Sequence, residues 1–150
     1  MIRFSNVSKH YPGGVEALKM INLHIETGAM AFITGRSGAG KSSLLRLIAL
    51  IERHSRGQII IDNQNLDRVR GRRVPLFRRN IGFMFQDHRL LYDRTVFDNV
   101  SLPLVIAGSR HQDIVKRTHA ALDKVGLLHK EKAYPVALSG GEQQRVGIAR

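Results

Sequence analysis

The sequence predicts an α/β fold in which a buried strand leads through a glycine-rich loop into a helix. Residues 29–33 are apolar throughout, which is typical of a short strand buried on both faces, and a glycine-rich segment follows at residues 35–42. Apolar residues then recur at helical spacing across residues 42–52. From about residue 95 the pattern becomes helical, so a helical block follows the α/β part.

The N-terminal region is predicted to be antiparallel. Ile21, Leu23 and Ile25 alternate with polar residues, and this period of two indicates a strand with one face in water. Residues 57–61 predict another strand, and residues 81–85 predict a second buried strand that ends at a polar pair. The α/β part therefore combines an antiparallel region with buried strands.

Three helices are predicted in the helical block. Residues 96–107 are apolar and interrupted by Pro103, while residues 113–125 form an amphipathic helix. Ser139 can cap a last helix, and the sequence reaches Arg150 after Val146 and Ile148 with no stop signal at its end. We therefore expect the chain to end inside a helix.

The composition indicates a soluble globular protein of one domain. The chain has 150 residues, of which 43% are hydrophobic and 24% charged, and this apolar content is enough for a core. No apolar run of about 18 residues occurs and the N-terminus lacks the layout of a secretory signal, so we expect a cytosolic chain. The absence of cysteine excludes a disulfide framework and a thiolate metal site.

The net charge of +12 would attract nucleic acid, an anionic lipid surface or nucleotide phosphates. Basic residues concentrate around Pro75, where a short helix is expected to start. A solvated basic face is the first interpretation of this cluster, contact with lipid or a partner the second, and nucleic acid the last. The cluster consists of Arg68, Arg70, Arg72, Arg73, Arg78 and Arg79.

The glycine-rich segment matches the phosphate-loop pattern Gly-x-x-x-x-Gly-Lys-Ser between a predicted strand and a predicted helix. Its glycines allow consecutive backbone N–H groups to turn toward a phosphate at a helix N-terminus. Lys41 would bring a positive charge to the β- and γ-phosphates, and the Ser42 hydroxyl would ligate Mg²⁺. Kinases, GTPases and transport ATPases share such a loop. The predicted phosphate loop consists of Gly35, Arg36, Ser37, Gly38, Ala39, Gly40, Lys41, Ser42 and Ser43.

Residues 138–145, Leu-Ser-Gly-Gly-Glu-Gln-Gln-Arg, resemble the signature of ATP-binding-cassette (ABC) proteins, and the resemblance covers essentially the whole chain. It implies a P-loop NTPase fold, the ABC nucleotide-binding domain, with a RecA-like parallel-sheet core, an N-terminal antiparallel β region and an α-helical subdomain. Residues 1–150 would form one such domain, truncated after the signature, with the C-terminal core strands missing. Residues 1–90 would supply the α/β core and β region, and residues 91–140 the helical subdomain.

The resemblance also implies a dimer. In this family two domains pack head to tail, so that the signature of one closes on the γ-phosphate held by the phosphate loop of the other. The chain is therefore expected to form a homodimer through an ATP-sandwiched interface. The residues expected to contribute from the signature are Ser139, Gly140, Gly141, Glu142 and Gln143.

The same resemblance implies roles for further residues. Gln86 follows a predicted strand, where the family has a glutamine that touches Mg²⁺ or the attacking water and faces a membrane partner. Tyr11 stands where the family stacks an aromatic ring on adenine. The implied cofactors are ATP and Mg²⁺, with Lys41 and Gln86 as catalytic residues and Ser42 and Gln86 as metal ligands.

Within the family, residues 81–100 resemble the cell-division ATP-binding proteins most. This implies a peripheral subunit at the cytoplasmic face of the inner membrane, bound to an integral membrane partner. The alternatives are the ATPase of a lipoprotein-releasing or macrolide-export system, a soluble nucleic-acid-associated ABC protein, or a scaffold that binds nucleotide without hydrolysis. No specific nucleic acid is expected, because such members carry zinc-binding cysteines or a second cassette.

Hydrolysis in this family needs an apolar strand ending in aspartate (Walker B), a following glutamate that polarises water, and a later histidine. All three follow the signature helix in the family, and none precedes Arg150. An ABC-type ATPase is therefore expected of the complete protein. Residues 1–150 by themselves are expected to bind nucleotide weakly and to turn it over negligibly.

Overall fold

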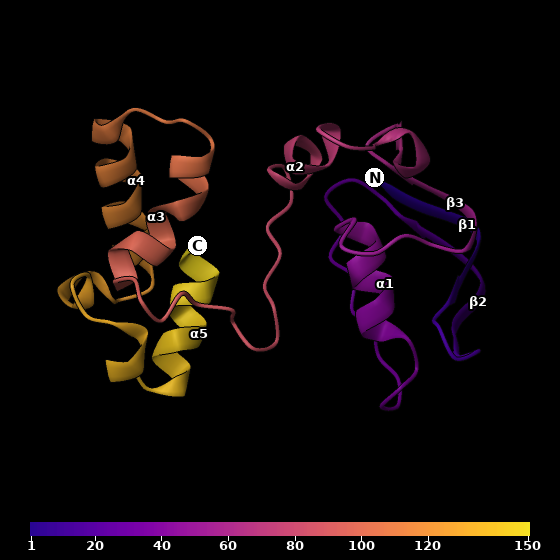
Figure 1. The fold of residues 1–150 in the computed structure, drawn as a ribbon, viewed down its shortest axis with the longest axis horizontal. Coiled ribbons are helices and arrows are strands. Elements are labelled where there is room, and N and C mark those ends of the chain that lie inside the picture. The colour runs from indigo at the N-terminus through magenta and orange to yellow at the C-terminus, as the bar shows by residue number, and fades with distance from the viewer. The chain divides into compact units, whose positions relative to one another are not determined.

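The computed structural model describes all residues from Met1 to Arg150. It forms two compact units, Met1–Ile81 and Gly82–Arg150 (Figure 1). The first unit contains the sheet and the helix that follows the phosphate loop, and the second unit is helical. No helix in either unit is long and apolar enough to span a bilayer.

A four-stranded antiparallel sheet forms the first unit's framework, in the order β2-β1-β3-β4. The alternation predicted around residues 21–25 is confirmed, because Leu23 is half-buried while Asn22 and His24 are exposed. The strands are β1 (Ile2–His10), β2 (Glu16–Ile25), β3 (Arg56–Ile61) and β4 (Gln64–Asn65).

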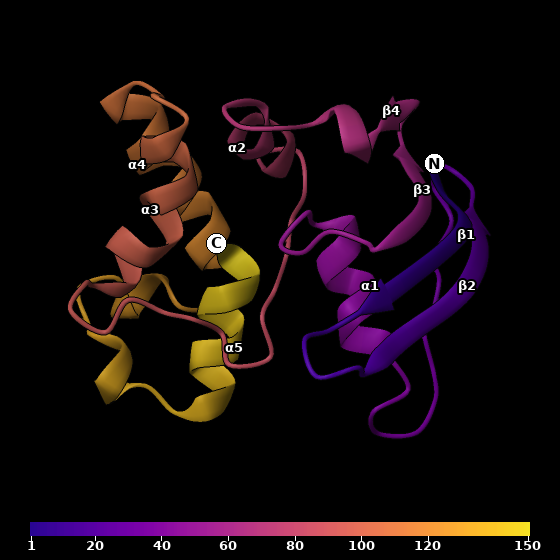
Figure 2. The ribbon, with the colours of Figure 1, turned by 45° about the vertical axis from the view of Figure 1, so that its right-hand side comes forward.

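Helix α1 (Lys41–Ile48) packs on this sheet, as Figure 2 shows. Its buried residues Leu44 and Leu47 meet Phe4 and Val7 of β1 in one hydrophobic core. The short helix α2 (Arg73–Arg78) buries Phe77 in the same core. The helix predicted across residues 42–52 is thus confirmed as α1, although α1 ends at Ile48, earlier than the apolar pattern suggests.

The buried strands predicted at residues 29–33 and 81–85 are not formed. Both segments are irregular, and Met30 and Phe32 are 85% and 83% exposed. A parallel strand satisfies its backbone N–H and C=O groups only by pairing with neighbours, and neither segment pairs with another strand in residues 1–150. Their continuous apolar pattern therefore does not suffice to make them strands, and no two strands pair in parallel within residues 1–150.

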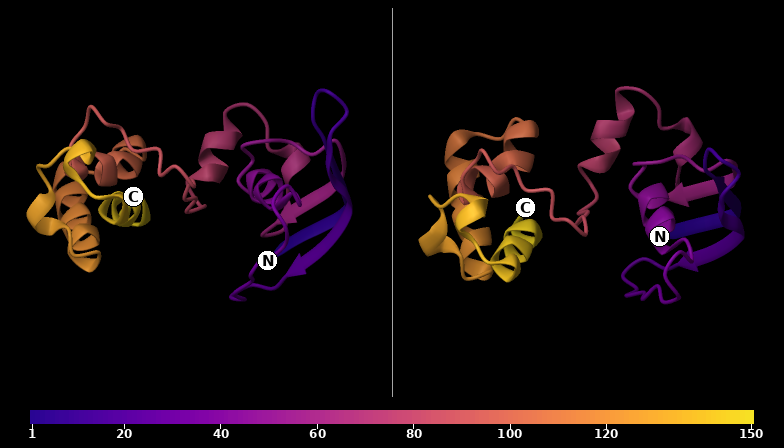
Figure 3. Two further views of the ribbon diagram at one scale, coloured as in Figure 1. Left: turned by 90° about the horizontal axis from the view of Figure 1, so that it is seen from below. Right: turned by 60° about the horizontal axis from the view of Figure 1, so that its bottom comes forward.

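The second unit contains three main helices, α3 (Val96–Ile106), α4 (His111–Lys124) and α5 (Gly140–Ala149) (Figure 3). The three predicted helices are confirmed. Helix α3 continues past Pro103, since a proline removes only one helical hydrogen bond and the Ala107 amide closes the last turn on the Pro103 carbonyl at 3.0 Å. The buried side chains that join these helices are Val96, Val100, Leu122, Leu127 and Val146.

The close pairing of β1 with β3 depends on Gly57. We expect Gly57→Ala to destabilise the first unit more than Gly14→Ala does. Both glycines have a positive φ, 92° and 81°, so an alanine incurs about 1–2 kcal/mol of strain at either. Only at Gly57 would the added Cβ meet the backbone, 2.4 Å from the Asn6 carbonyl oxygen, adding about 1–3 kcal/mol of overpacking. Urea unfolding of both variants measures the difference, and equal losses would contradict the steric account.

Candidate functional site

The phosphate loop leads into the N-terminus of α1. Residues 35–39 are exposed, and Gly40 is the N-cap of the helix with a left-handed backbone, φ 86°. No side chain accepts a hydrogen bond from the first turn of α1. Its amides and the positive end of the helix dipole are therefore available to an anion.

Gly40 is required by its surroundings as well as by its backbone angle. A Cβ at this position would lie 2.3 Å from the Ala17 carbonyl oxygen and 2.8 Å from the Leu18 side chain. Real Cβ atoms do not approach a backbone oxygen so closely, so only glycine fits. Strand β2 therefore fixes the position from which α1 starts.

Lys41 is the first residue of α1, and its side chain folds back over the phosphate loop. The Nζ donates hydrogen bonds to the carbonyl oxygens of Gly35 and Arg36, both at 2.8 Å. The ammonium group is thus held above the loop by neutral acceptors. A phosphate oxygen is a stronger acceptor for such a donor, so the lysine can exchange these contacts for an anion.

Tyr11 lies beside the first turn of α1. Its hydroxyl donates to Glu52 Oε2 at 2.5 Å and lies 3.0 Å from Ser43 Oγ, while Lys9 Nζ lies 4.8 Å from its ring centroid. Burial raises the pKa of Glu52, but the hydrogen bonds from Tyr11, Arg46 and Lys9 outweigh burial and leave this pKa below its ordinary value. The ring is therefore held close to the phosphate loop by a charged network.

Ser42 is exposed in the first turn of α1, and Ser43 is half-buried. Because Ser43 faces Tyr11, the hydroxyl left open toward solvent is that of Ser42. Ser42 therefore has an open hydroxyl at the loop, and its role as a metal ligand stays a prediction.

The signature segment, residues 139–143, begins helix α5 in the second unit. Ser139 is the N-cap, as its position in the sequence predicts. Glu142 Oε2 accepts hydrogen bonds from the Ser139 amide at 2.9 Å and from its hydroxyl at 3.1 Å, and the Glu142 amide donates back to Ser139 Oγ at 3.3 Å. This capping box fixes the position of the Ser139 hydroxyl.

Glu142 has a second partner that the sequence did not identify. Lys130 Nζ lies 2.5 Å from Glu142 Oε1. The hydrogen bond from Lys130 and that from the Ser139 amide lower the pKa of Glu142 from 4.5 to about 2. Lys130 therefore neutralises the carboxylate that positions Ser139.

The remaining signature residues divide into an anchored side chain and two open glycines. Gln143 Nε2 donates to the Pro135 carbonyl at 3.0 Å, and Tyr92 donates to Gln143 Oε1 at 3.3 Å. Gly140 and Gly141 are exposed, and a Cβ at either would meet nothing within 4 Å. The backbone at the start of α5 is thus open to a large ligand or a partner.

Gln86 is an exposed loop residue of the second unit, so it shares a unit with the signature segment, while the phosphate loop and Tyr11 belong to the first. The two residues His88 and Arg89 have positive φ values, 54° and 44°, which are strained for side chains of this kind. The Arg150 guanidinium donates to the carbonyl oxygens of both, at 3.1 Å and 2.9 Å. The Gln86 loop is therefore fastened to the C-terminal end of α5.

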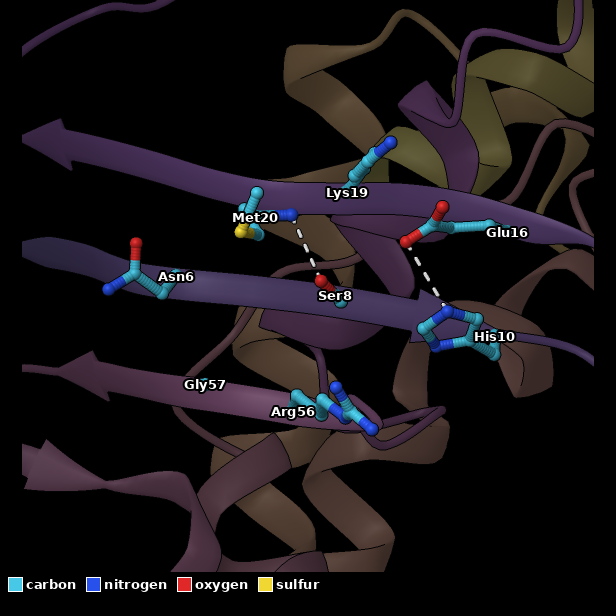
Figure 4. Close-up of a pocket in the computed structure, with 8 residues that line it drawn as sticks. All are labelled: Asn6, Ser8, His10, Glu16, Lys19, Met20, Arg56 and Gly57. Atoms are coloured by element: carbon cyan, nitrogen blue, oxygen red, sulfur yellow. Dashed lines mark hydrogen bonds and ion pairs between the residues drawn. The ribbon is translucent and has the colours of Figure 1, made fainter.

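A hollow of about 810 Å³ lies on the sheet of the first unit, and none of the predicted site residues lines it (Figure 4). Several of its polar groups have partners within the sheet: Ser8 Oγ accepts from the Met20 amide at 2.9 Å, and His10 pairs with Glu16 at 3.3 Å. It is a wide, shallow depression over β1, β2 and β3, with no side chains converging on a point. The phosphate loop therefore remains the predicted binding site of the first unit.

Residues 18–150 match the ABC transporter family. The cell division ATP-binding protein FtsE of Escherichia coli (strain K12) is 59% identical over 150 residues, which are 100% of this chain and 68% of that protein. The methionine import ATP-binding protein MetN of Bradyrhizobium diazoefficiens is 46% identical over 155 residues, 100% of this chain and 45% of that protein. A solved dimeric structure of the ATP-binding cassette MJ0796, in a post-hydrolysis state bound to ADP and Pi, gives a TM-score of 0.92 at 35% identity, covering 99% of this chain and 68% of that one. These likenesses confirm the fold class predicted from the sequence.

Replacing Lys130 should change how stability depends on pH. The pKa of Glu142 is about 2 in the folded chain and near 4.5 ordinarily, so the carboxylate contributes stability above pH 4.5 that is lost as the pH falls toward 2. In Lys130→Met the pKa of Glu142 should rise, and less stability should be lost over this interval. NMR titration of the Glu142 carboxyl carbon measures the pKa directly.

Lys132→Met is the matched control for this prediction. Lys132 is exposed, two residues away, and has no ion-pair partner. Its replacement should leave the Glu142 titration unchanged. If the titration midpoint of Glu142 were the same in Lys130→Met as in the unaltered chain, the pairing of Lys130 with Glu142 would be contradicted.

Proposed function

Because this chain belongs to the ABC transporter family, we propose that it is the ATP-binding subunit of a membrane complex that acts in cell division. Family membership implies ATP hydrolysis by the whole protein. Two copies would close on ATP, and this closure would move an integral membrane partner at the cytoplasmic face of the inner membrane. The identity to FtsE over the whole chain supports the cell-division role.

One observation carries the proposal: the chain has two separate helix N-termini that suit phosphate. The first turn of α1 has no side-chain cap, and α5 presents the capped Ser139 beside the open Gly140 and Gly141. The phosphate loop of the chain accounts only for the first of these N-termini. The second site is explained if it serves the γ-phosphate held by another copy, which in a symmetric dimer gives two equal composite sites.

Mg²⁺ would be held by the Ser42 hydroxyl, which is exposed at the loop, and by the Gln86 side-chain oxygen. The chemistry that Mg²⁺ supplies when bound is positive charge that offsets the charge of the phosphate groups. Lys41 would hold the β- and γ-phosphates, and Tyr11 would stack on adenine from its position beside Ser43.

Coupling to the partner would pass along α5. Its N-terminal Ser139 would engage the γ-phosphate, and its C-terminal Arg150 holds the backbone of His88 and Arg89 next to Gln86. A shift of the helix would therefore be transmitted to the Gln86 loop. ATP can drive this shift only because the signature contact exists in the closed dimer and not in the open one.

The ATP-driven dimer can be tested with two variants of the full chain and one matched control. Lys41→Ala should weaken nucleotide binding about 10- to 100-fold, because it removes a charged hydrogen bond. Ser139→Ala should leave nucleotide binding intact but reduce ATP-dependent dimerisation. Equilibrium dialysis with nucleotide and analytical ultracentrifugation with and without MgATP separate the two effects.

Thr95→Ala is the matched control for Ser139→Ala. Thr95 makes the same kind of capping box with Asp98 at the start of α3, so its loss destabilises the second unit similarly, by about 1 kcal/mol. It should dimerise on ATP like the unaltered chain. If Thr95→Ala and Ser139→Ala reduce ATP-dependent dimerisation equally, a contact between Ser139 and ATP is not what drives dimerisation.

The partner we propose is an integral membrane subunit of the FtsX type. We expect it to co-purify from detergent-solubilised membranes with the full chain, and a Gln86→Ala variant to recover less of it. Mass spectrometry identifies the recovered subunit. Recovery of a lipoprotein-releasing, macrolide-export or methionine-import permease in its place would overturn the cell-division assignment while leaving the ATP-driven dimer untouched.

A further inference from the structure

The basic cluster of residues 68–79 has no role in the proposed ATP site. It places six arginines within twelve positions, and no acidic residue occurs between Arg68 and Gln86. Such crowding of like charge destabilises the folded chain through repulsion unless an anion relieves it. The structure shows which of these arginines are engaged within the fold and which are not.

Arg78 and Arg70 serve the fold. Arg78 donates to the carbonyl oxygens of Ala49 and Leu50, at 3.3 Å and 2.6 Å, and so satisfies the C-terminal end of α1. Arg70 Nε donates to the Asp67 carbonyl at 3.0 Å. These contacts are with neutral backbone oxygens, so they leave the positive charge of the cluster uncompensated.

The guanidinium groups of three other arginines have no partner. Arg68, Arg72 and Arg73 are exposed, and each side chain lacks both a hydrogen bond and an ion pair. The nearest acid along the chain, Asp67, pairs instead with His54 at 3.1 Å. These positive charges face solvent unopposed.

Helix α2 arranges part of the cluster around an apolar residue. Leu76 is 56% exposed, and it follows Arg73 by three positions and Arg72 by four, so the three side chains share one face of the helix. Arg79 lies one turn further on. Phe77, only 8% exposed, faces the core. We call Arg72, Arg73, Leu76 and Arg79 the α2 face.

We propose that the α2 face binds the anionic lipid head groups of a membrane surface. Arginines would contact phosphate groups, and Leu76 would enter the boundary between head groups and acyl chains. A nucleic-acid surface fits less well, because sequence-tolerant nucleic-acid sites expose aromatic rings for stacking and the one aromatic residue of this segment, Phe77, is buried. The proposal goes beyond the ATP-driven function and does not depend on it.

The test is co-sedimentation of the full chain with vesicles, without a membrane partner or nucleotide. Vesicles of phosphatidylcholine alone are compared with vesicles in which phosphatidylglycerol replaces part of it. We expect binding to the anionic vesicles only, and weaker binding as salt is added. At about 1 kcal/mol for each arginine near the surface, the Arg72→Gln/Arg73→Gln double variant should bind roughly 30-fold more weakly.

A charge-matched control separates the α2 face from the net charge of +12. Lys116→Gln/Arg117→Gln removes two exposed positive charges from α4, so it should bind anionic vesicles much as the unaltered chain does. Leu76→Asn should weaken binding without changing its salt dependence. Both arginine positions are exposed, so the double variant should fold and still dimerise on MgATP.

Three results would overturn the proposal. One is equal binding to neutral vesicles, and another is an equal loss in the α4 control, which would assign the attraction to net charge. The third is tighter binding to duplex DNA than to anionic vesicles, with the same sensitivity to Arg72→Gln/Arg73→Gln, which would make the α2 face a nucleic-acid surface. None of these results affects the measurement of ATP-driven dimerisation.

Discussion

The start of an α-helix leaves backbone N–H groups without partners, and the candidate site depends on how the chain treats two such starts. At α1 the N-cap is Gly40, which has no side chain to offer, and β2 lies too close for any other residue. At α5 the N-cap is Ser139, which Glu142 and Lys130 hold in place. One start is left open to an anion, and the other presents a positioned hydroxyl whose neighbouring carboxylate already has a counterion.

Features that depend on local spacing could be predicted from the sequence. The phosphate loop follows from the positions of Gly35, Gly40 and Lys41, and the cap of α5 follows from Ser139 before its helix. The alternation in β2 likewise gave the correct buried face. In each case the partners lie within a few residues of one another, so the pattern contains the whole interaction.

Features that depend on distant partners could not be predicted. The apolar segments at residues 29–33 and 81–85 have the composition of buried strands, but a strand exists only with neighbours to accept its hydrogen bonds. Lys130 pairs with a residue twelve positions away, and Arg78 reaches carbonyl groups at the end of α1. No periodicity signals such contacts, and Arg78 looks in the sequence like any other arginine of the basic cluster.

The hydrogen bond of Tyr11 has an optical consequence. The chain contains no tryptophan and three tyrosines, so its intrinsic ultraviolet fluorescence comes from tyrosine alone. A carboxylate that accepts the phenol proton quenches tyrosine emission, and Glu52 does so for Tyr11 at the edge of the phosphate loop, while Tyr92 and Tyr134 lie in the other unit. We therefore expect this contact to weaken the emission of Tyr11. An event at the loop that frees the phenol should then increase the fluorescence of the unlabelled protein.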